Sequence, residues 1–236
     1  MFRIKICGVR SETDIDSVAE AGADAVGFNF HPPSIRYVDA PQAIRLSVRA
    51  AQRSLTRVGV FVEQSVDEIS RIADSAQIDF VQLHGGQTIA DALWLSDRGF
   101  RVIRVIRLAV GPLDPESISA AVASWGFGDF PLLLDAEAGA HGGGLGLRLD
   151  WEAIGKWSKI EMFSEKVPQT SGEAKAQWAL AGGLTPETVG EAIANSHATA
   201  IDVASGVEEP RGEKCRHKID LFVNAALAAW GLAESS

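Results

Sequence analysis

The sequence predicts an α/β protein that folds as a single-domain (β/α)₈ barrel, the TIM-barrel architecture, over residues 1–236. Eight short apolar runs rich in β-branched residues recur along the chain, and segments with helical spacing lie between them. The runs are mostly continuous rather than alternating, which is typical of parallel strands buried on both faces. Eight strand–helix units in 236 residues match the size of such a barrel.

The predicted strands are separated by turn residues and helix-start signals. They cover 3–7, 24–30, 57–62, 79–84, 101–107, 130–135, 177–182 and 199–205. The last run is as apolar as the first, and in a closed barrel these two strands would be neighbours. An open, doubly wound sheet is the alternative, but no G-x-G-x-x-G motif follows the first run. The closed barrel is therefore favoured.

Capping signals mark several of the predicted helices. Ser11 precedes an apolar-periodic segment that stops at Gly22. Ser65 is followed three residues later by Glu68, which is the pattern of a capping box. Residues 218–232 are alanine-rich and amphipathic, which predicts a final helix.

The segment before the seventh strand departs from the regular alternation of strands and helices. Residues 156–178 are mixed in character, and we expect them to hold the sixth helix and then a polar loop around 168–172. The connection between the sixth and seventh strands is therefore predicted to be long, around 156–176. Beyond it, Thr185 is predicted to cap the seventh helix, with Pro186 at the first helical position.

Composition and charge exclude several kinds of partner. With a net charge of −9 and a pI of about 5.1, the chain lacks the basic footprint of a nucleic-acid binder, and anionic membranes would repel it. No apolar run is long enough to span a membrane, and Arg3 and Lys5 interrupt the first run, unlike a signal peptide. Cys7 and Cys215 are too few for a disulfide framework. We expect a cytoplasmic protein without nucleic-acid or membrane partners.

The loops after the seventh and eighth strands predict a phosphate site. In such barrels catalysis takes place where strands end, and phosphate is bound by these two loops. Glycines follow both strands, and they let backbone N–H groups approach an anion. The predicted phosphate-binding residues are Gly182, Gly183, Ala204, Ser205 and Gly206. Tight turns without a ligand are the alternative for either loop.

Polar side chains at other strand ends are candidates for chemistry. Asp135 ends an apolar run and is either a general acid or base, or a helix cap or ion-pair partner. Cys7 is either a buried structural cysteine or a reactive thiol. Arg36 follows two prolines and is either solvated or paired with a carboxylate. Further candidate substrate contacts are Gln82, His84 and Asp202.

The histidines do not predict a metal site. His84 is at least as well explained by a neutral ring satisfied by the backbone as by a catalytic one. The other histidines are His31, His141, His197 and His217, and they do not cluster with carboxylates at metal-ligand spacing. No metal is expected.

Several motifs together resemble one known family. They are KICG at 5–8, VQLHG at 81–85, LLLDA at 132–136, the glycine-rich stretch at 143–151 that ends in LRLDW, LAGGLTPETV at 180–189 and IDVASGVE at 201–208. Their order and spacing resemble phosphoribosylanthranilate isomerase, a barrel enzyme of tryptophan biosynthesis. The resemblance runs from Lys5 to about Gly206 and covers 151–178 poorly. Each motif alone is weak, whereas the set is specific.

The resemblance implies a reaction and residue roles. The reaction is the Amadori rearrangement of N-(5-phosphoribosyl)anthranilate to 1-(2-carboxyphenylamino)-1-deoxyribulose 5-phosphate, which requires no cofactor. In this sequence the general base would be Cys7 and the general acid Asp135, and Arg36 would hold the anthranilate carboxylate. The expected partner is thus a small phosphorylated substrate, and the chain is expected to be a monomer or a homodimer.

These roles place demands on two pKa values. A free thiol has a pKa of about 8.5, so Cys7 needs only a modest lowering to yield thiolate. Asp135 needs a rise of about 3 units from about 3.9 to be half protonated near neutral pH. Burial beside Leu133 and Leu134 is the expected cause, and a thiolate at Cys7 would act in the same direction.

The sequence departs from the family pattern at Arg10, Leu145, Ala204 and Cys215. Leu145 and Ala204 each lack a hydroxyl that the family usually has. Because backbone N–H groups still bind phosphate, we expect the affinity to change rather than disappear. Cys215 stands where the family commonly has aspartate, and it is expected to cap the last helix poorly.

Two alternative functions compete with the one that this resemblance implies. A related sugar-phosphate isomerase of histidine biosynthesis, or a dual-substrate variant, prefers a carboxylate at the end of the first strand, so Cys7 argues against it. A non-catalytic phosphate-binding barrel would not need both Cys7 and Asp135. The isomerase of tryptophan biosynthesis is therefore favoured.

Overall fold

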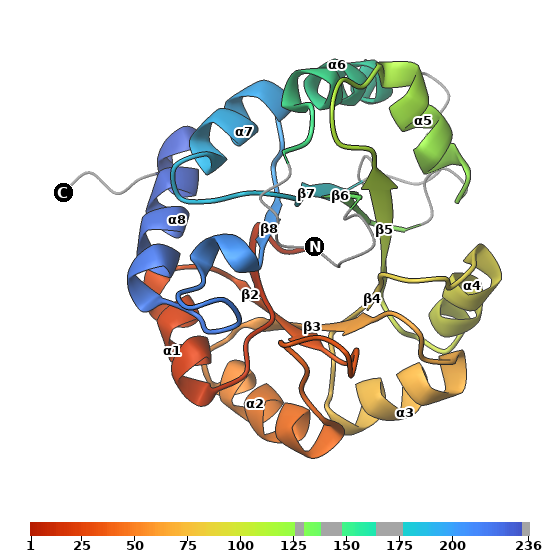
Figure 1. Cartoon of the computed structure of the whole chain (residues 1–236). Coiled ribbons are helices and arrows are strands. Elements are labelled where there is room, and N and C mark those ends of the chain that lie inside the picture. Colours follow the sequence, from red (N-terminus) through yellow and green to blue (C-terminus); the bar gives the residue numbers. More distant parts are fainter. Residues whose placement is uncertain (126–129, 138–147, 164–176, 233–236) are drawn as a thin grey trace.

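The computed structural model describes residues 1–125, 130–137, 148–163 and 177–232, and eight parallel strands form a closed barrel (Figure 1). The strands follow chain order, and β1 pairs with both β2 and β8. They are β1 (Ile4–Cys7), β2 (Ala25–Asn29), β3 (Thr56–Phe61), β4 (Phe80–Leu83), β5 (Val102–Leu108), β6 (Leu132–Ala136), β7 (Trp178–Leu180) and β8 (Ile201–Val203). The predicted fold is confirmed, including the contact between the first and last strands.

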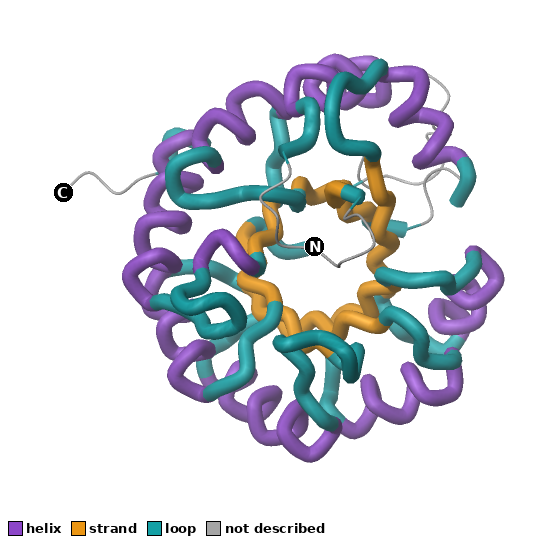
Figure 2. The backbone as a smooth tube through the Cα atoms, viewed as in Figure 1, coloured by secondary structure: helices purple, strands orange, loops and turns teal. Residues whose placement is uncertain are grey.

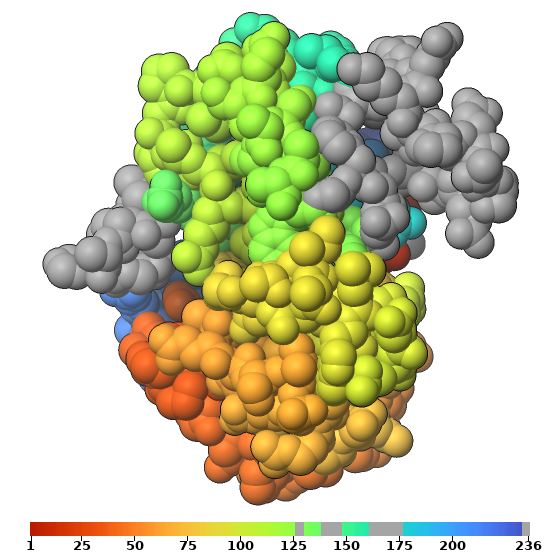
Figure 3. All heavy atoms as spheres, turned by 90° about the vertical axis from the view of Figure 1, so that its right-hand side faces the viewer, coloured from red at the N-terminus to blue at the C-terminus, as the bar shows by residue number. Residues whose placement is uncertain are grey.

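Helices surround the barrel on its outside (Figure 2). They are α1 (Glu12–Ala21), α2 (Ala40–Gln52), α3 (Val66–Ser75), α4 (Ile89–Asp97), α5 (Pro115–Ala123), α6 (Trp151–Phe163), α7 (Val189–Ser196) and α8 (Arg216–Ala229), with the 3₁₀ helix η1 (Ser205–Val207) before α8. Figure 3 shows the side on which α3, α4 and α5 cover the strands. In the described part of the chain, none of the helices has the length and apolar character needed to cross a membrane.

Predicted side-chain caps are found at two helices, and the expected weak cap is found at a third. Ser11 forms a complete capping box with Asp14, and α1 ends at Gly22 in the left-handed conformation. The side chain of Ser65 accepts a hydrogen bond from the Glu68 amide at 3.3 Å, but the reciprocal bond of a capping box is not formed in this described helix. Cys215 is the N-cap of α8 and makes no side-chain capping bond, as expected.

Three predicted boundaries are wrong. The helix α7 begins at Val189 rather than Pro186, because the Thr188 amide donates to the Thr185 carbonyl in a tighter turn first. The eighth strand ends at Val203, since the chain turns into η1 from Ser205. The helix α6 begins at Trp151, earlier than the predicted 156, and the polar loop predicted around 168–172 lies outside the described residues.

The interior of the barrel is apolar near the amino-terminal ends of the strands. Side chains that point inward there form one buried cluster, which includes Phe2, Ala25, Val58, Phe80, Ile103, Leu133, Ala179 and Ala200. The outward-facing side chains of the same strands form a larger core with the helices. Polar side chains replace the apolar ones toward the carboxyl ends, so this end of the barrel holds the groups that chemistry requires.

Candidate active site

The alternation of side chains along each strand directs polar groups into the barrel mouth. Ile4 and Ile6 pack in the outer core, so Lys5 and Cys7 face the interior of the barrel. On the other strands, the apolar residues of the inner cluster show which alternate positions face the interior. The polar side chains aligned with them are Gln82, His84, Arg107, Asp135 and Asp202. The predicted pair on β1 and β6 therefore faces one interior.

Lys5 lies at the centre of this polar group. Its ammonium group is completely buried, donates to Oε1 of Gln82 at 2.8 Å and lies 3.0 Å from Oδ2 of Asp202. Burial opposes the charge of Lys5, but Asp202 outweighs burial and raises the pKa of the ammonium group. Burial likewise raises the pKa of Asp202, and Lys5 limits that rise. The other carboxylate oxygen of Asp202, Oδ1, has no partner among the described residues.

A hydrogen-bonded series leads from Lys5 across the mouth to His84, which lies beside Asp135. Since Oε1 of Gln82 accepts from Lys5, its amide nitrogen donates to Nδ1 of His84 at 3.1 Å. The remaining ring nitrogen of His84 then carries the proton and lies 3.5 Å from Oδ2 of Asp135. Burial, with Arg107 next in importance, lowers the pKa of His84 to about 4, so the ring is neutral at pH 7.

Asp135 has the raised pKa that a general acid needs. Burial in the barrel mouth raises the pKa of its carboxyl group to about 6, and the charge on Asp202 adds to the rise. The side chain keeps 24% of its surface accessible, so a ligand can still reach it. The direction of the predicted shift is confirmed, while the second cause is Asp202 rather than a thiolate at Cys7.

The pKa of Cys7 is shifted against the formation of thiolate, contrary to the expectation that the thiolate forms readily. Burial raises the pKa of its thiol, and the nearby Asp202 carboxylate acts in the same direction. Three cations oppose the rise, namely Lys5, Lys214 and Arg36. The thiol is thus the dominant form at neutral pH, and the cations determine how much thiolate exists.

Arg36 is paired with a carboxylate of the protein itself. Its Nε and Nη2 donate to the two oxygens of Glu208 at 2.6 and 2.8 Å. Lys214 also donates to Glu208, at 2.8 Å, and to the Ala204 carbonyl at 2.8 Å. These cations lower the pKa of Glu208 to about 2, against the effect of its burial. Arg36 is therefore paired rather than solvated, and its predicted role toward a substrate carboxylate stays a prediction.

The two predicted phosphate loops are in contact with each other. A Cβ atom added to Gly206 would lie 1.9 Å from the Leu184 carbonyl oxygen, so only glycine permits this approach. The amides of Gly183, Ser205 and Gly206 donate no hydrogen bond to any described residue. Ser205 and Gly206 open the short helix η1, and an extra helix of this kind completes phosphate sites in such barrels. Gly182 lies against Asp135, which places the loops beside the predicted acid.

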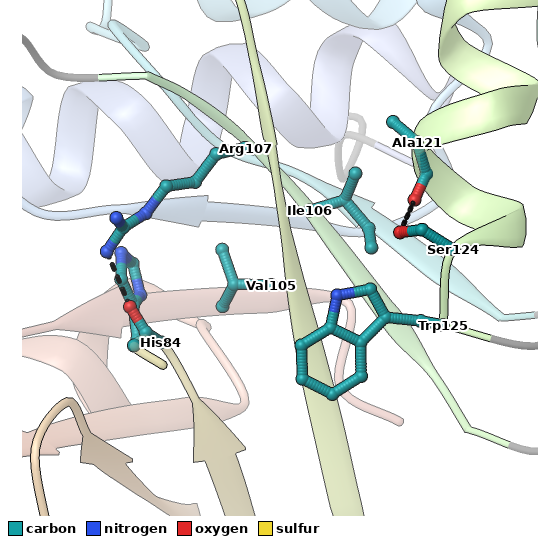
Figure 4. Close-up of a pocket in the computed structure, with 8 residues that line it drawn as sticks. His84, Val105, Ile106, Arg107, Ala121, Ser124 and Trp125 are labelled. Carbon is teal, nitrogen blue, oxygen red and sulfur yellow. Dashed lines mark hydrogen bonds between the residues drawn. The ribbon is translucent and has the colours of Figure 1, made fainter. Parts of the chain in front are cut away.

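A cavity of about 230 Å³ adjoins the mouth (Figure 4). It is lined by His84 and Arg107 at one end and by Trp125 at the other, and Nη2 of Arg107 donates to the His84 carbonyl at 2.6 Å. Neither Cys7 nor Asp135 lines it, so it flanks the candidate site. Leu145 and the rest of the predicted glycine-rich loop lie outside the described residues. The described residues contain no group of three or more potential metal ligands.

Several mouth residues had no predicted role. They are Lys5, Arg107, Glu208 and Lys214. A lysine in phase with Cys7 on a strand that is otherwise apolar was a signal for Lys5. The partner of Glu208 lies 172 residues away, and no local pattern reveals it.

Comparisons with known proteins identify the family and agree with the fold. The family model described as N-(5'phosphoribosyl)anthranilate (PRA) isomerase matches residues 4–225. An N-(5'-phosphoribosyl)anthranilate isomerase from Ruegeria sp. is 37% identical over 96% of this chain and 98% of its own length. The crystal structure of phosphoribosyl anthranilate isomerase from Thermotoga maritima aligns with a TM-score of 0.79 and 32% identity, covering 97% of this chain and all of its own. A second structure, in complex with reduced 1-(o-carboxyphenylamino)-1-deoxyribulose 5-phosphate, aligns at 0.76 with 32% identity and the same coverage.

Proposed function

Because the chain belongs to the N-(5'-phosphoribosyl)anthranilate isomerase family, we propose that it catalyses the Amadori rearrangement of N-(5-phosphoribosyl)anthranilate with the residues of this barrel mouth. The chain is an isomerase of tryptophan biosynthesis. The observation that carries the residue roles is the shared interior that Cys7 on β1 and Asp135 on β6 face. Neither the family model nor the curated relatives support the histidine-pathway or the non-catalytic alternative.

Asp135 acts as the general acid. Its protonated carboxyl group donates a proton to the furanose ring oxygen, and the ring opens to an iminium at C1 as the C1–O bond breaks. A pKa of about 6 leaves about one molecule in ten protonated at pH 7, compared with about one in a thousand for an ordinary aspartate. The neutral ring of His84 stays beside the carboxylate without competing as an acid.

Cys7 acts as the general base. The thiolate removes the proton from C2, and the electrons of the C–H bond form the C1–C2 double bond while the iminium nitrogen is neutralised. The enolamine then tautomerises to the ketone of the product. Lys5, Lys214 and Arg36 stabilise the thiolate that this step needs.

The remaining residues bind the two charged ends of the substrate. The unengaged amides of Gly183, Ser205 and Gly206 bind the phosphate, in contact with Gly182 and Ala204. Arg36 binds the anthranilate carboxylate. Asp202 contacts the sugar part of the substrate, with Gln82 and His84 on the opposite wall. The two free thiols fit a cytoplasmic location, and a monomer or homodimer remains the prediction.

Complementation tests the function directly. A strain that lacks this isomerase and requires tryptophan should grow without it when the chain is expressed. The Cys7→Ala and Asp135→Asn variants, expressed to the same level, should not restore growth. Absence of growth with the wild-type chain, despite soluble folded protein, would contradict the assignment.

A further inference from the structure

Glu208 fixes three groups at the edge of the site. Its Oε1 accepts from Nε of Arg36 at 2.6 Å and from Lys214 at 2.8 Å. Its Oε2 accepts from Nη2 of Arg36 at 2.8 Å and from the Gly212 amide at 2.9 Å. Only 1% of the side chain is exposed. Four hydrogen bonds in a dry environment hold this carboxylate in one orientation.

The fork leaves a second edge of Arg36 unused. A guanidinium group is planar and carries five N–H donors, arranged so that two different edges each match a carboxylate. Glu208 occupies the Nε–Nη2 edge. Nη1 makes no hydrogen bond with any described residue, so the Nη1–Nη2 edge remains open to another carboxylate.

The charge of the cluster also requires an anion. Arg36 and Lys214 carry two positive charges, Glu208 carries one negative charge, and the side chains are 12%, 1% and 1% exposed. Asp202, the next carboxylate, is already paired with Lys5. One positive charge therefore remains unbalanced in a largely buried place, where an unpaired charge is costly.

Packing holds the arginine beside the thiol. The Arg36 stem crosses Gly8, which follows Cys7 directly and has a φ of +77°. A Cβ atom at Gly8 would lie 2.4 Å from Cδ of Arg36. The stem is thus confined by Gly8 while the head is confined by Glu208, so the open edge has a defined place near the base.

We propose that Glu208 is a positioning residue that orients Arg36, so that the open guanidinium edge receives the aryl carboxylate of the substrate. Glu208 itself does not touch the substrate. The inference rests on the proposed function and assigns Glu208 to substrate affinity rather than to the proton transfers. An aryl carboxylate placed there satisfies both the free donors and the unbalanced charge.

The test compares Glu208→Gln with Glu209→Gln, a neighbouring carboxylate that is 67% exposed and pairs with Lys218. For N-(5-phosphoribosyl)anthranilate, Glu208→Gln should raise KM by at least about tenfold and leave kcat within about threefold, the signature of lost uniform binding. The affinity for reduced 1-(o-carboxyphenylamino)-1-deoxyribulose 5-phosphate, measured by calorimetry, should fall by a similar factor. Glu209→Gln should match the wild type in all three quantities.

A second substrate separates positioning from general damage. N-(5-phosphoribosyl)aniline lacks the carboxylate, so its kcat/KM should differ by less than about twofold between Glu208→Gln and the wild type. Equal losses on both substrates, or no loss on either, would overturn the proposal. A wild-type chain that isomerises neither substrate would overturn the proposed function and this inference with it.

A double variant keeps the test valid if Glu208→Gln folds poorly. Glu208→Gln combined with Lys214→Met removes one charge of each sign and preserves the net charge of the cluster. It should fold, as judged by circular dichroism and thermal unfolding, and still show the raised KM for the carboxylated substrate. Recovery of the wild-type KM would show that charge balance, not orientation of Arg36, is what Glu208 supplies.

Discussion

The two halves of the barrel mouth hold the same number of reacting groups but very different charge. On the β8–β1–β2 side, the cations Lys5, Arg36 and Lys214 act on the Cys7 thiol. On the β4–β6 side, Asp135 lies beside a neutral histidine, and the cation on these strands that acts on it is Arg107. Burial raises the pKa of both reacting groups. A raised pKa favours the protonated form that a general acid needs. It disfavours the deprotonated form that a general base needs. The positive charges are thus concentrated where burial works against the reaction.

Removing either reacting group should have the largest effect. Cys7→Ala and Asp135→Asn should each lower kcat by about 10²–10⁴-fold, the usual contribution of a positioned acid or base. Both variants should fold, since neither creates a buried unpaired charge. Steady-state kinetics with circular dichroism as the folding control measures this. Near-wild-type kcat in both variants would contradict the assignment of the general base to one half of the mouth and of the general acid to the other.

Lys5 is the cation that acts on both halves, and its removal should cost stability. Lys5→Met leaves Asp202 buried without its partner, which should lower the free energy of unfolding by about 3–5 kcal/mol. Lys5→Met combined with Asp202→Asn should recover most of that loss. Urea unfolding of the two variants checks this. Equal stability of the single and double variants would mean that the buried pair is not what stabilises the barrel interior.

The contrast between the halves also predicts the pH profile. In the proposed mechanism the productive enzyme holds a protonated Asp135 and a Cys7 thiolate. Below pH 6 the carboxyl group is already protonated, so kcat/KM should fall about tenfold per unit with the thiolate fraction. From pH 6 up to the raised pKa of Cys7, the gain in thiolate offsets the loss of the acid proton, and kcat/KM should stay level.

The control for this profile is the His84→Ala variant. Water entering the space of the ring should reduce the burial of Asp135, lower its pKa, and move the acid limb below pH 6. A wild-type limb centred well above pH 6 would show that the carboxyl group is not the proton donor.

The fold was predictable because its signals are local. Each apolar run and each cap lies within a few residues, and eight of them in order specify a barrel. The positions of Cys7, Asp135 and the two glycine-containing loops in the barrel mouth were predictable for a related reason, since each follows a strand end. Their roles stay predictions. The contacts among mouth residues were not predictable, because barrel closure determines them. Arg36 and Glu208 meet across 172 positions, and neither sequence neighbourhood indicates the other.

The contacts formed by barrel closure also explain why the prediction of a readily formed thiolate at Cys7 was wrong. A free thiol with a pKa of about 8.5 needs little help, and the sequence does not show that Asp202 approaches it from the neighbouring strand. The raised pKa of Asp135 was predictable in direction, because the leucines before it already indicated burial. Its second cause, again Asp202, lies on β8, and the pairing of β6, β7 and β8 that brings it near Asp135 is not visible in the sequence.

The smallest predicted effect concerns the start of α8, on the cation-rich side. Cys215 is the N-cap and makes no side-chain capping bond. Cys215→Asp should stabilise the protein by about 1 kcal/mol, since aspartate accepts from the free amides of the first turn. Cys215→Ala lacks the cap and serves as the matched control in thermal unfolding. The new carboxylate follows Lys214, so kcat/KM also reports whether the charge of this half is finely set. An unchanged kcat/KM would mean that Glu208, Arg36 and Lys214 alone set the charge of this half, and a large fall would show that the start of α8 contributes to it as well.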